Sequence, residues 1–231
     1  MTRAPFLHPV LLDHCRRLVA EFPQIPPSRR ALLQQLATYL LGKFRTGNTP
    51  RVNVICTHNS RRSHMGQFWL AAGADFFGLP ELQSFSGGTE ATAFHPRAVT
   101  ALRELGFVLE PDSPGPNPVY TVRWNAGGST PPYRAFSKVY SAPPNPDSDF
   151  AAVLVCTEAD AGCPVVLGSD FRLALPFEDP KVADGTPYAA ERYRERARDI
   201  GREFLYCLND VCQQLKTDAD PVPDCTECVA I

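Results

Sequence analysis

The stretch RVNVICTHNSRRS, residues 51–63, decides the fold. The apolar run 52–55 predicts a buried strand, and the apolar positions after Ser63 recur at helical spacing. Between the strand and the helix lie Cys56 and Arg62, six positions apart. The sequence therefore predicts a strand, a tight loop and a helix N-terminus, with a cysteine and an arginine at the two ends of the loop.

The spacing of this loop suits a tetrahedral oxyanion. Five intervening residues allow the backbone N–H groups to point inward at an anion, and the planar fork of Arg62 can hold two of its oxygens. The helix N-terminus directs its partial positive charge into the same space. The predicted oxyanion-binding residues are Thr57, His58, Asn59, Ser60, Arg61, Arg62 and Ser63.

Cys56 is the predicted nucleophile. Cysteines at helix N-termini beside arginine are favoured as thiolates. The Ser63 hydroxyl can donate to that sulfur, and Asn59 can hold the loop through bonds to the backbone. For the bare Cys-x5-Arg spacing, a structural cysteine with an arginine nearby by chance is an equal alternative. The preceding strand and the following helix favour the functional interpretation.

Length, charge and cysteine content limit the function classes. A chain of 231 residues with 44% hydrophobic residues can form one catalytic domain with small additions. Its net charge of −2 gives no electrostatic reason to expect nucleic acid or an anionic membrane as a partner. We find no signal-like N-terminus or membrane-length apolar run, so we expect a cytoplasmic protein. Eight cysteines are too few for a disulfide scaffold at this length, so some are expected to be reactive or metal-binding.

The pattern along the chain predicts three regions. Residues 1–50 resemble two amphipathic helices joined at 23–27 and form a helical N-terminal extension. Residues 51–217 alternate strand and helix, and residues 218–231 form a tail. The expected strands are 52–55, 82–86, 150–155 and 171–175, and a last helix opens at 186–187. This alternation predicts an α/β fold with a four-stranded parallel sheet, doubly wound by helices.

A proline-rich insertion interrupts the predicted catalytic domain. Residues 111–146 hold nine of the 23 prolines, and two strand-like runs, 119–124 and 133–140, lie on either side of an Asn-Ala-Gly-Gly turn at 125–128. A hairpin is therefore expected. The hairpin either flanks the active site or is a solvated decoration.

Three further residues are candidates for chemistry. Cys156 follows the third expected strand and Cys163 lies seven positions later, with a small polar segment between them. The carboxyl ends of parallel strands share one edge of a sheet, so these cysteines are expected near the Cys56 loop. They either form a reversible disulfide or fill apolar space. Asp179 follows the fourth strand on the same edge, as a general acid or as a turn cap.

Other polar groups give weaker signals. Ser86, at the end of the second strand, either braces Asn59 or a cation or lies in a plain strand-to-loop turn, and the two readings have equal weight. Cys225 and Cys228 form a lone Cys-x-x-Cys, for which inert thiols, a redox relay and zinc are the alternatives, in that order. His8, His14 and Cys15 lack ligand spacing, so we expect structural roles for them. No metal site and no cofactor are predicted.

Taken together, these motifs resemble the low-molecular-weight protein tyrosine phosphatase superfamily, and within it the thioredoxin-coupled arsenate reductases. The resemblance covers about residues 51–217 without the insertion. The matching motifs are Cys-Thr-x-Asn-Ser-x-Arg-Ser at 56–63, Ser-x-Gly-x-Glu at 86–90, x-Pro-[Lys/Arg]-Ala at 95–98, Cys-x6-Cys-Pro at 156–164 and Phe-x-Asp-Pro at 177–180. Ordinary phosphatases of the superfamily lack the pair Cys156 and Cys163, which therefore favours the reductases.

The resemblance implies a three-cysteine relay. Cys56 would attack arsenate held by Arg62 and the loop amides, and Asp179 would protonate the departing hydroxide. Cys156 would then attack Cys56 and release arsenite, after which Cys163 would attack Cys156 and present a Cys156–Cys163 disulfide to thioredoxin. Arsenate or phosphate is the implied ligand, and thioredoxin is the implied reductant.

This chain departs from the family pattern at three positions. His58 replaces a usual glycine, Arg61 replaces a frequent cysteine, and Gln67 replaces a glutamate that is associated with potassium-assisted support of the loop. Two alternatives therefore stay open beside arsenate reduction. Cys56, Arg62 and Asp179 suffice for a phosphomonoester hydrolase. A non-catalytic oxyanion-binding module is the third reading, if His58 and Arg61 spoil the loop geometry.

Overall fold

The computed structural model describes residues 7–112, 114–125, 132–163 and 165–219. Its helices are α1 (Pro9–Ala20), η1 (Phe22–Gln24), α2 (Pro27–Arg45), α3 (Arg62–Phe77), α4 (Pro96–Glu104), α5 (Thr157–Gly162), η2 (Pro180–Ala183) and α6 (Ala189–Ala219). Its strands are β1 (Arg51–Cys56), β2 (Gln83–Gly88), β3 (Val108–Pro111), β4 (Tyr120–Arg123), β5 (Tyr133–Ala135), β6 (Phe150–Leu154) and β7 (Ser169–Ala174). Within these described ranges, no helix is long and apolar enough to cross a membrane.

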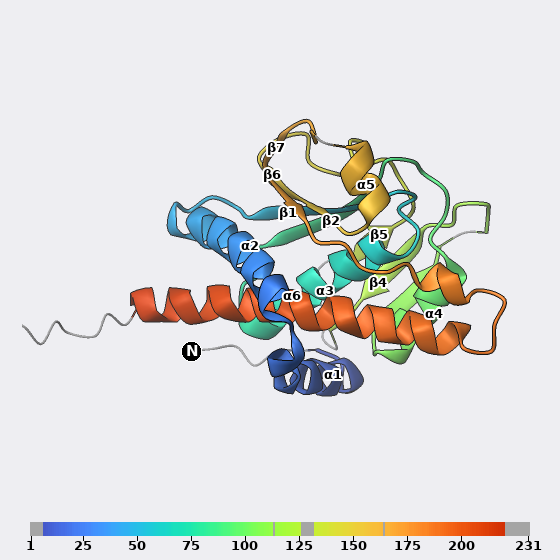
Figure 1. The fold of residues 1–231 in the computed structure, drawn as a ribbon, viewed down its shortest axis with the longest axis horizontal. Coiled ribbons are helices and arrows are strands. Elements are labelled where there is room, and N and C mark those ends of the chain that lie inside the picture. The colour runs from blue at the N-terminus through green and yellow to red at the C-terminus, as the bar shows by residue number, and fades with distance from the viewer. Residues whose placement is uncertain (1–6, 113, 126–131, 164, 220–231) are drawn as a thin grey trace, which may run out of the picture.

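The central sheet has four parallel strands in the order β2-β1-β6-β7 (Figure 1). Ile55 of β1 pairs with Gly87 of β2 on one side and with Leu154 of β6 on the other. The carboxyl ends of all four strands therefore meet at one edge, where Cys56 ends β1. The expected α/β fold with a four-stranded parallel sheet is confirmed.

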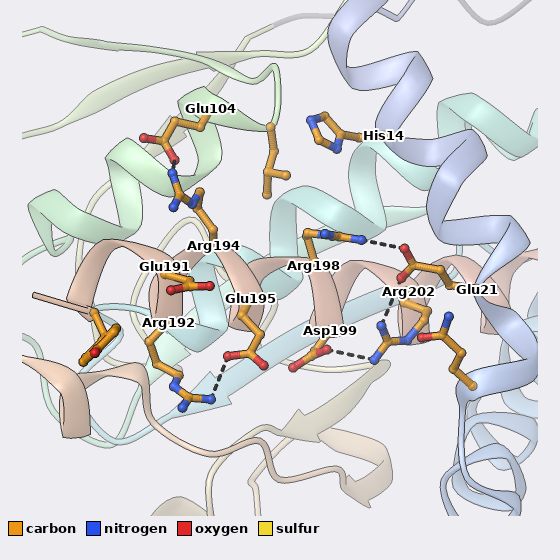
Figure 2. Close-up of a pocket in the computed structure, with 13 residues that line it drawn as sticks. His14, Glu21, Glu104, Glu191, Arg192, Arg194, Glu195, Arg198, Asp199 and Arg202 are labelled. Carbon is orange, nitrogen blue, oxygen red and sulfur yellow. Dashed lines mark hydrogen bonds and ion pairs between the residues drawn. The ribbon is translucent and has the colours of Figure 1, made fainter.

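The N-terminal helices α1 and α2 pack against the last helix, α6 (Figure 1). Arg29 of α2 donates to both carboxylate oxygens of Glu203 in α6. A hollow of about 840 Å³ lies between α4, α6 and the turn after α1. Figure 2 shows that ion pairs line it, among them Arg198 and Arg202 with Glu21. The hollow is thus bordered by arginines whose charges are already paired.

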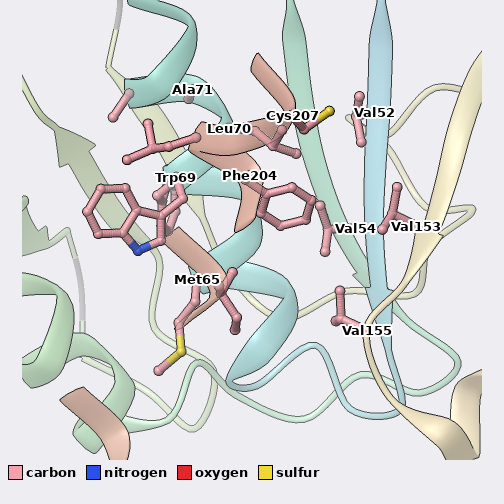
Figure 3. Close-up of a cluster of buried hydrophobic side chains, with 14 of the residues drawn as sticks. Val52, Val54, Met65, Trp69, Leu70, Ala71, Val153, Val155, Phe204 and Cys207 are labelled. Atoms are coloured by element: carbon pink, nitrogen blue, oxygen red, sulfur yellow. The ribbon is translucent and has the colours of Figure 1, made fainter. Parts of the chain in front are cut away.

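Helices α3 and α6 cover one face of the sheet (Figure 3). Val52 and Val54 of β1 meet Phe204 of α6 and apolar residues of α3, all fully buried. Asn53 points to the opposite face, where its Nδ2 donates to the Tyr140 carbonyl. The irregular segment after β5 therefore covers the other face of β1.

The proline-rich insertion forms a second, antiparallel sheet in the order β3-β4-β5. The expected pairing of two strands is present, although β5 ends at Ala135 instead of continuing to Tyr140, and β3 joins as a third strand. Of the turn predicted at 125–128, only Asn125 lies within the described residues, where it forms an antiparallel bridge with Leu7. Residues 136–140, which we name the loop strap, return to the main sheet, and Ser137 and Lys138 in it are buried. This part of the insertion is therefore no solvated decoration.

Candidate active site

The loop after β1 holds the nucleophile candidate in a chain of polar contacts. The Cys56 Sγ lies 3.1 Å from the Ser63 Oγ, and the Asn59 Nδ2 donates to that same Oγ over 2.9 Å. Because Ser63 already accepts from Asn59, its own hydrogen is available to the sulfur. Asn59 adopts a left-handed backbone with φ 43°, which asparagine tolerates better than most residues. Asn59 and Ser63 thus support Cys56 through consecutive hydrogen bonds.

Arg62 is the first residue of α3, and its guanidinium is buried at the mouth of the loop. Its Nη1 donates to the Phe177 carbonyl and its Nη2 to the Asp179 Oδ2, both over 2.7 Å. Asp179 also accepts from the Lys181 backbone N–H, so the turn-cap and site interpretations of this residue are compatible. The structure brings Cys56, Arg62 and Asp179 together.

A hollow of about 10 Å³ lies inside this loop, roughly the room that one water molecule needs. We call it the cradle, and its lining residues are Cys56, Thr57, His58, Ser60, Arg61, Arg62 and Asp179. The carboxylate of Asp179 occupies part of the Arg62 fork. An oxyanion must therefore displace that carboxylate or share Arg62 with it.

Arg61 lines the cradle, but its charge is partly engaged elsewhere. Its Nε donates to the Tyr193 hydroxyl over 2.8 Å, and its Nη2 lies 3.7 Å from the Asp184 carboxylate. A weaker approach of 4.0 Å joins its Nε to Asp179. Arg61 therefore links the loop to α6 and η2 in addition to placing positive charge beside the cradle.

The second candidate cysteine lies next to the loop. The Val155 N–H donates to the Ile55 carbonyl. This bond extends the pairing of β6 with β1 to the residue before Cys156. The Cys156 Sγ lies 3.4 Å from the Thr57 Oγ1 and accepts from the Ala159 N–H. Burial raises the pKa of the Cys156 thiol, and the hydrogen bond from Thr57 opposes that shift. Cys156 is therefore held as a thiol beside the loop.

The third candidate cysteine lies at the far end of α5. Cys156 is the N-cap of that helix and Cys163 its C-cap. Cys163 is half-buried, and its carbonyl accepts from the Arg172 guanidinium. The cysteines in the described ranges are free thiols. The structure brings Cys156 to the loop and leaves Cys163 separated from it by α5.

The loop strap contains supporting residues that the sequence did not reveal. The Ser137 Oγ donates to the His58 carbonyl over 2.9 Å and accepts from the Thr92 N–H. The Lys138 backbone N–H donates to the Asn59 Oδ1 over 2.9 Å. The strap thereby holds the outer side of the loop. The only signal in the sequence was the strand-like run 133–140, which says nothing about its partner.

Ser86 supports α3 instead of Asn59. Its Oγ donates to the Gln67 Oε1 over 2.7 Å and lies 3.2 Å from the His64 Nδ1. The proposed brace between Ser86 and Asn59 was therefore wrong, and Lys138 takes that role. His64 is fully buried, and this burial together with the charge of Lys138 holds its pKa well below the usual value, so the ring is neutral.

No metal centre is evident in the described part of the chain, where no three His, Cys, Asp or Glu side chains group suitably. Burial raises the pKa of Cys15 to about 12, in keeping with a packing role. Cys225 and Cys228 lie outside the described residues, so their predicted roles stay predictions.

Comparison with curated proteins finds similarity to arsenate reductases. No family model matches the chain. Arsenate reductase 2 of Staphylococcus epidermidis is 28% identical over 151 residues, which cover 65% of this chain and 92% of the relative. An arsenate reductase of Halalkalibacterium halodurans is 27% identical over 158 residues, 68% of this chain and 94% of the relative. The resemblance to arsenate reductases that the sequence predicted is confirmed by these similarities.

Solved structures with a similar arrangement include an arsenate reductase and a phosphatase. An arsenate reductase in the phosphate binding state has 19% sequence identity and a TM-score of 0.42, over 71% of this chain and 98% of that one. A low-molecular-weight phosphotyrosine phosphatase from Vibrio cholerae O395 has 15% identity and a TM-score of 0.41, over 75% and 99% of the two chains.

Proposed function

We propose that this chain is an arsenate reductase that works through Cys56, Cys156 and Cys163. The observation that carries the proposal is a second sulfur at the nucleophile loop, the Cys156 Sγ 3.4 Å from the Thr57 hydroxyl. Phosphoryl transfer alone does not need that sulfur. The similarity to curated arsenate reductases supports the same choice.

The proposed reaction proceeds through three successive attacks by cysteine sulfurs. The Cys56 thiolate attacks arsenic, and Asp179 gives a proton to the departing hydroxide. Cys156 then attacks the Cys56 sulfur, the electron pair of the S–As bond reduces arsenic, and arsenite leaves. Cys163 attacks Cys156, which frees Cys56 and forms a Cys156–Cys163 disulfide. An external dithiol, for which we propose thioredoxin, reduces that disulfide.

The last step requires α5 to unwind. Seven residues at the helical rise place the two ends of the helix about 10 Å apart, whereas the Cα atoms of a disulfide are usually less than about 7 Å apart. A helix of six residues is marginal on its own, and Ala159 is its buried residue. The relay thus needs a local change that a short helix permits.

The proposed domain division follows from this function. Residues 51–217 would form the catalytic domain, with the insertion 111–146 supplying the loop strap, and residues 1–50 would form an extension packed on α6. Residues 218–231 would form the tail, and we propose a cytoplasmic location because the relay requires free thiols.

The Cys163→Ser variant tests the relay. It should perform a single turnover, with about one arsenite released per enzyme, and then stop, because Cys56 stays in a disulfide with Cys156. The measurement is arsenate-dependent NADPH consumption with thioredoxin and its reductase. Cys212→Ser on α6 is the matched control and should turn over repeatedly. Undiminished multiple turnover by Cys163→Ser would reject the relay.

Aryl phosphate hydrolysis and ligand-dependent stability distinguish the two alternative functions from arsenate reduction. A phosphomonoester hydrolase would cleave aryl phosphates, would lose this activity in Cys56→Ser and would keep it in Cys156→Ser. An oxyanion-binding module would be stabilised against unfolding by phosphate or arsenate and would turn over neither substrate.

A further inference from the structure

Two arginines approach the same carboxylate at the cradle. The Arg62 Nη2 donates to one oxygen of Asp179 over 2.7 Å, and the Arg61 Nε lies 4.0 Å from the other oxygen. The carboxylate of Asp179 thus marks a place at which both guanidinium groups are directed. An oxyanion that displaces this carboxylate would meet both positive charges, because Arg61 and Arg62 both line the cradle.

Arg61 is held at this place by a contact with α6. Its Nε donates to the Tyr193 hydroxyl over 2.8 Å, and its side chain is 16% exposed. A free arginine side chain has many rotamers, and fixing it on an arriving anion costs conformational entropy. The contact with Tyr193 restricts Arg61 before the anion arrives, so less of this entropy is lost on binding.

Tyr193 is itself held firmly. The residue is 1% exposed, and its ring stacks on the His95 ring with centroids 5.4 Å apart. Burial raises the pKa of Tyr193, and the hydrogen bond from Arg61 opposes that shift, so the hydroxyl is protonated at neutral pH. It accepts from Arg61 and donates to the Asp184 Oδ2 over 3.3 Å. The hydroxyl is therefore fixed from two sides.

Asp184 leaves the charge of Arg61 available. Its Oδ2 lies 3.7 Å from the Arg61 Nη2, whereas its Oδ1 accepts from the Arg97 Nη1 over 3.3 Å. The carboxylate divides its attraction between two arginines, and ion pairs near solvent contribute little. An anion in the cradle can therefore still attract Arg61.

We propose that Tyr193 is a positioning residue for oxyanion binding, whose hydroxyl holds the Arg61 guanidinium beside that of Arg62 at the cradle. Two guanidinium groups favour tetrahedral anions with two negative charges, such as the dianions of arsenate and phosphate. This role rests on the proposed function of the cradle as the arsenate site and does not involve Cys156 or Cys163. It belongs to this chain, since Arg61 stands where the family frequently has cysteine.

The affinity for inorganic phosphate, measured by titration calorimetry, tests this role without turnover. Tyr193→Phe keeps the buried ring and removes the hydroxyl, so it should weaken phosphate binding about tenfold, the effect of one hydrogen bond to a charged group. Arg61→Gln should weaken binding at least as much. Tyr206→Phe is the matched control and should bind phosphate like the native protein. This half-buried tyrosine of α6 packs on Phe22, and its hydroxyl has no hydrogen-bond partner within the described ranges.

The double variant separates positioning from a structural effect. If Tyr193 acts through Arg61, the protein with both substitutions should bind phosphate no more weakly than Arg61→Gln alone. Losses that multiply would mean that Tyr193 acts through the fold as a whole, and would overturn the proposed role. Arsenate turnover gives a second measurement, in which Tyr193→Phe should raise KM about tenfold and change kcat less than about twofold.

Native phosphate affinity in Tyr193→Phe or in Arg61→Gln, or no phosphate binding by the native protein, would also overturn this role. Arsenate reduction by the native protein with thioredoxin tells the two proposals apart. Weaker phosphate binding in Tyr193→Phe without any arsenate reduction by the native protein keeps the role of Tyr193 and rejects the reductase. Reduction together with unchanged phosphate affinity in Tyr193→Phe keeps the reductase and rejects the role of Tyr193.

Discussion

Lys138 is the most unusual side chain near the loop. The residue is 5% exposed, and its Nζ lies 4.9 Å from the centre of the Phe136 ring without an ion pair to any described carboxylate. Burial lowers the pKa of Lys138 from 10.5 to about 8. A buried cation without a partner is costly. Its backbone N–H donates to Asn59, so this segment supports the loop although the buried charge destabilises the fold.

Lys138→Met should therefore stabilise the protein at pH 7. The unfolded chain keeps the lysine proton up to about 10.5, while the folded protein releases it near 8, so native stability should rise as pH increases between those values. Removing the charge should raise the free energy of unfolding at pH 7 by about 3 kcal/mol, from 1.36 kcal/mol per pKa unit. Urea unfolding at pH 7 and 10 measures both effects.

A matched control is Lys216→Met, which replaces an exposed lysine of α6. It should change neither the stability at pH 7 nor its rise with pH. If Lys138→Met were no more stable than the native protein at pH 7 and kept the native pH dependence, the buried ammonium would not be the destabilising group.

The strand, loop and helix around Cys56 could be predicted from the sequence, because one short segment carries the whole signal. Cys56, Arg62 and the intervening loop lie within seven consecutive positions, and the strand and helix on either side were visible as apolar patterns. The roles of Ser137 and Lys138 were not visible, because they depend on where the insertion folds back. Their contacts to His58 and Asn59 join residues 79 positions apart.

At the scale of elements, the packing of α3 against α6 depends on three glycines, Gly66, Gly73 and Gly201. A Cβ at Gly201 of α6 would lie 2.5 Å from the Trp69 ring of α3, which is fully buried. A Cβ at Gly66 of α3 would lie 2.9 Å from Phe204 and from Val54. The absence of side chains at these positions therefore allows both helices to lie close to each other and to β1.

Gly201→Ala should destabilise the fold, by about 1–3 kcal/mol, because a rigid buried ring cannot move aside without disturbing its neighbours. Gly42→Ala in α2 is the matched control, since a Cβ there meets nothing within 4 Å. That change should stabilise the helix by about 0.5–1 kcal/mol. Thermal unfolding of both variants measures the difference. Equal effects of the two substitutions would show that the α3–α6 contact is looser than the structure indicates.

Periodicity predicted most of the elements, since it is a local property. The strands β1, β2, β6 and β7 and the helices α2, α3 and α6 follow the apolar patterns of the sequence. The end of β5 and the third strand β3 could not be predicted in the same way. Pairing in the second sheet is set by contacts between segments such as Val108 and Arg123, and no single run of residues encodes them.

At the scale of the whole molecule, the N-terminal helices contribute to the main core. Their buried apolar residues include Leu11, Leu18, Leu33, Leu36 and Leu40, all with no exposed surface. Amphipathic patterns predicted these helices, but their partner was not visible from the sequence. Arg29 and Glu203 are 174 positions apart in the sequence, and nothing near either residue predicts that the two form an ion pair.

The ion pair between Arg29 and Glu203 permits a test of how strongly the N-terminal extension is bound to α6. Glu203 is 6% exposed, and burial raises the pKa of its carboxylate, opposed by Arg29. Arg29→Met would leave a buried carboxylate unpaired, so we expect a loss of about 3–5 kcal/mol in unfolding free energy at pH 7. Arg45→Met is the control, because Arg45 pairs with Asp218 between the same two helices at an exposed position, and we expect a much smaller loss than for Arg29→Met.

Acidification should separate a charge effect from a packing effect in Arg29→Met. Without Arg29, the pKa of Glu203 should rise further, so the folded variant binds a proton more readily than its unfolded chain, whose carboxyl titrates near its ordinary value. The deficit relative to the native protein should therefore shrink as pH falls from 7 to 5. Urea unfolding at both pH values measures it. A deficit that is equal at pH 7 and 5, or equal to that of Arg45→Met, would mean that apolar packing of α2, not the buried ion pair, holds the extension to α6.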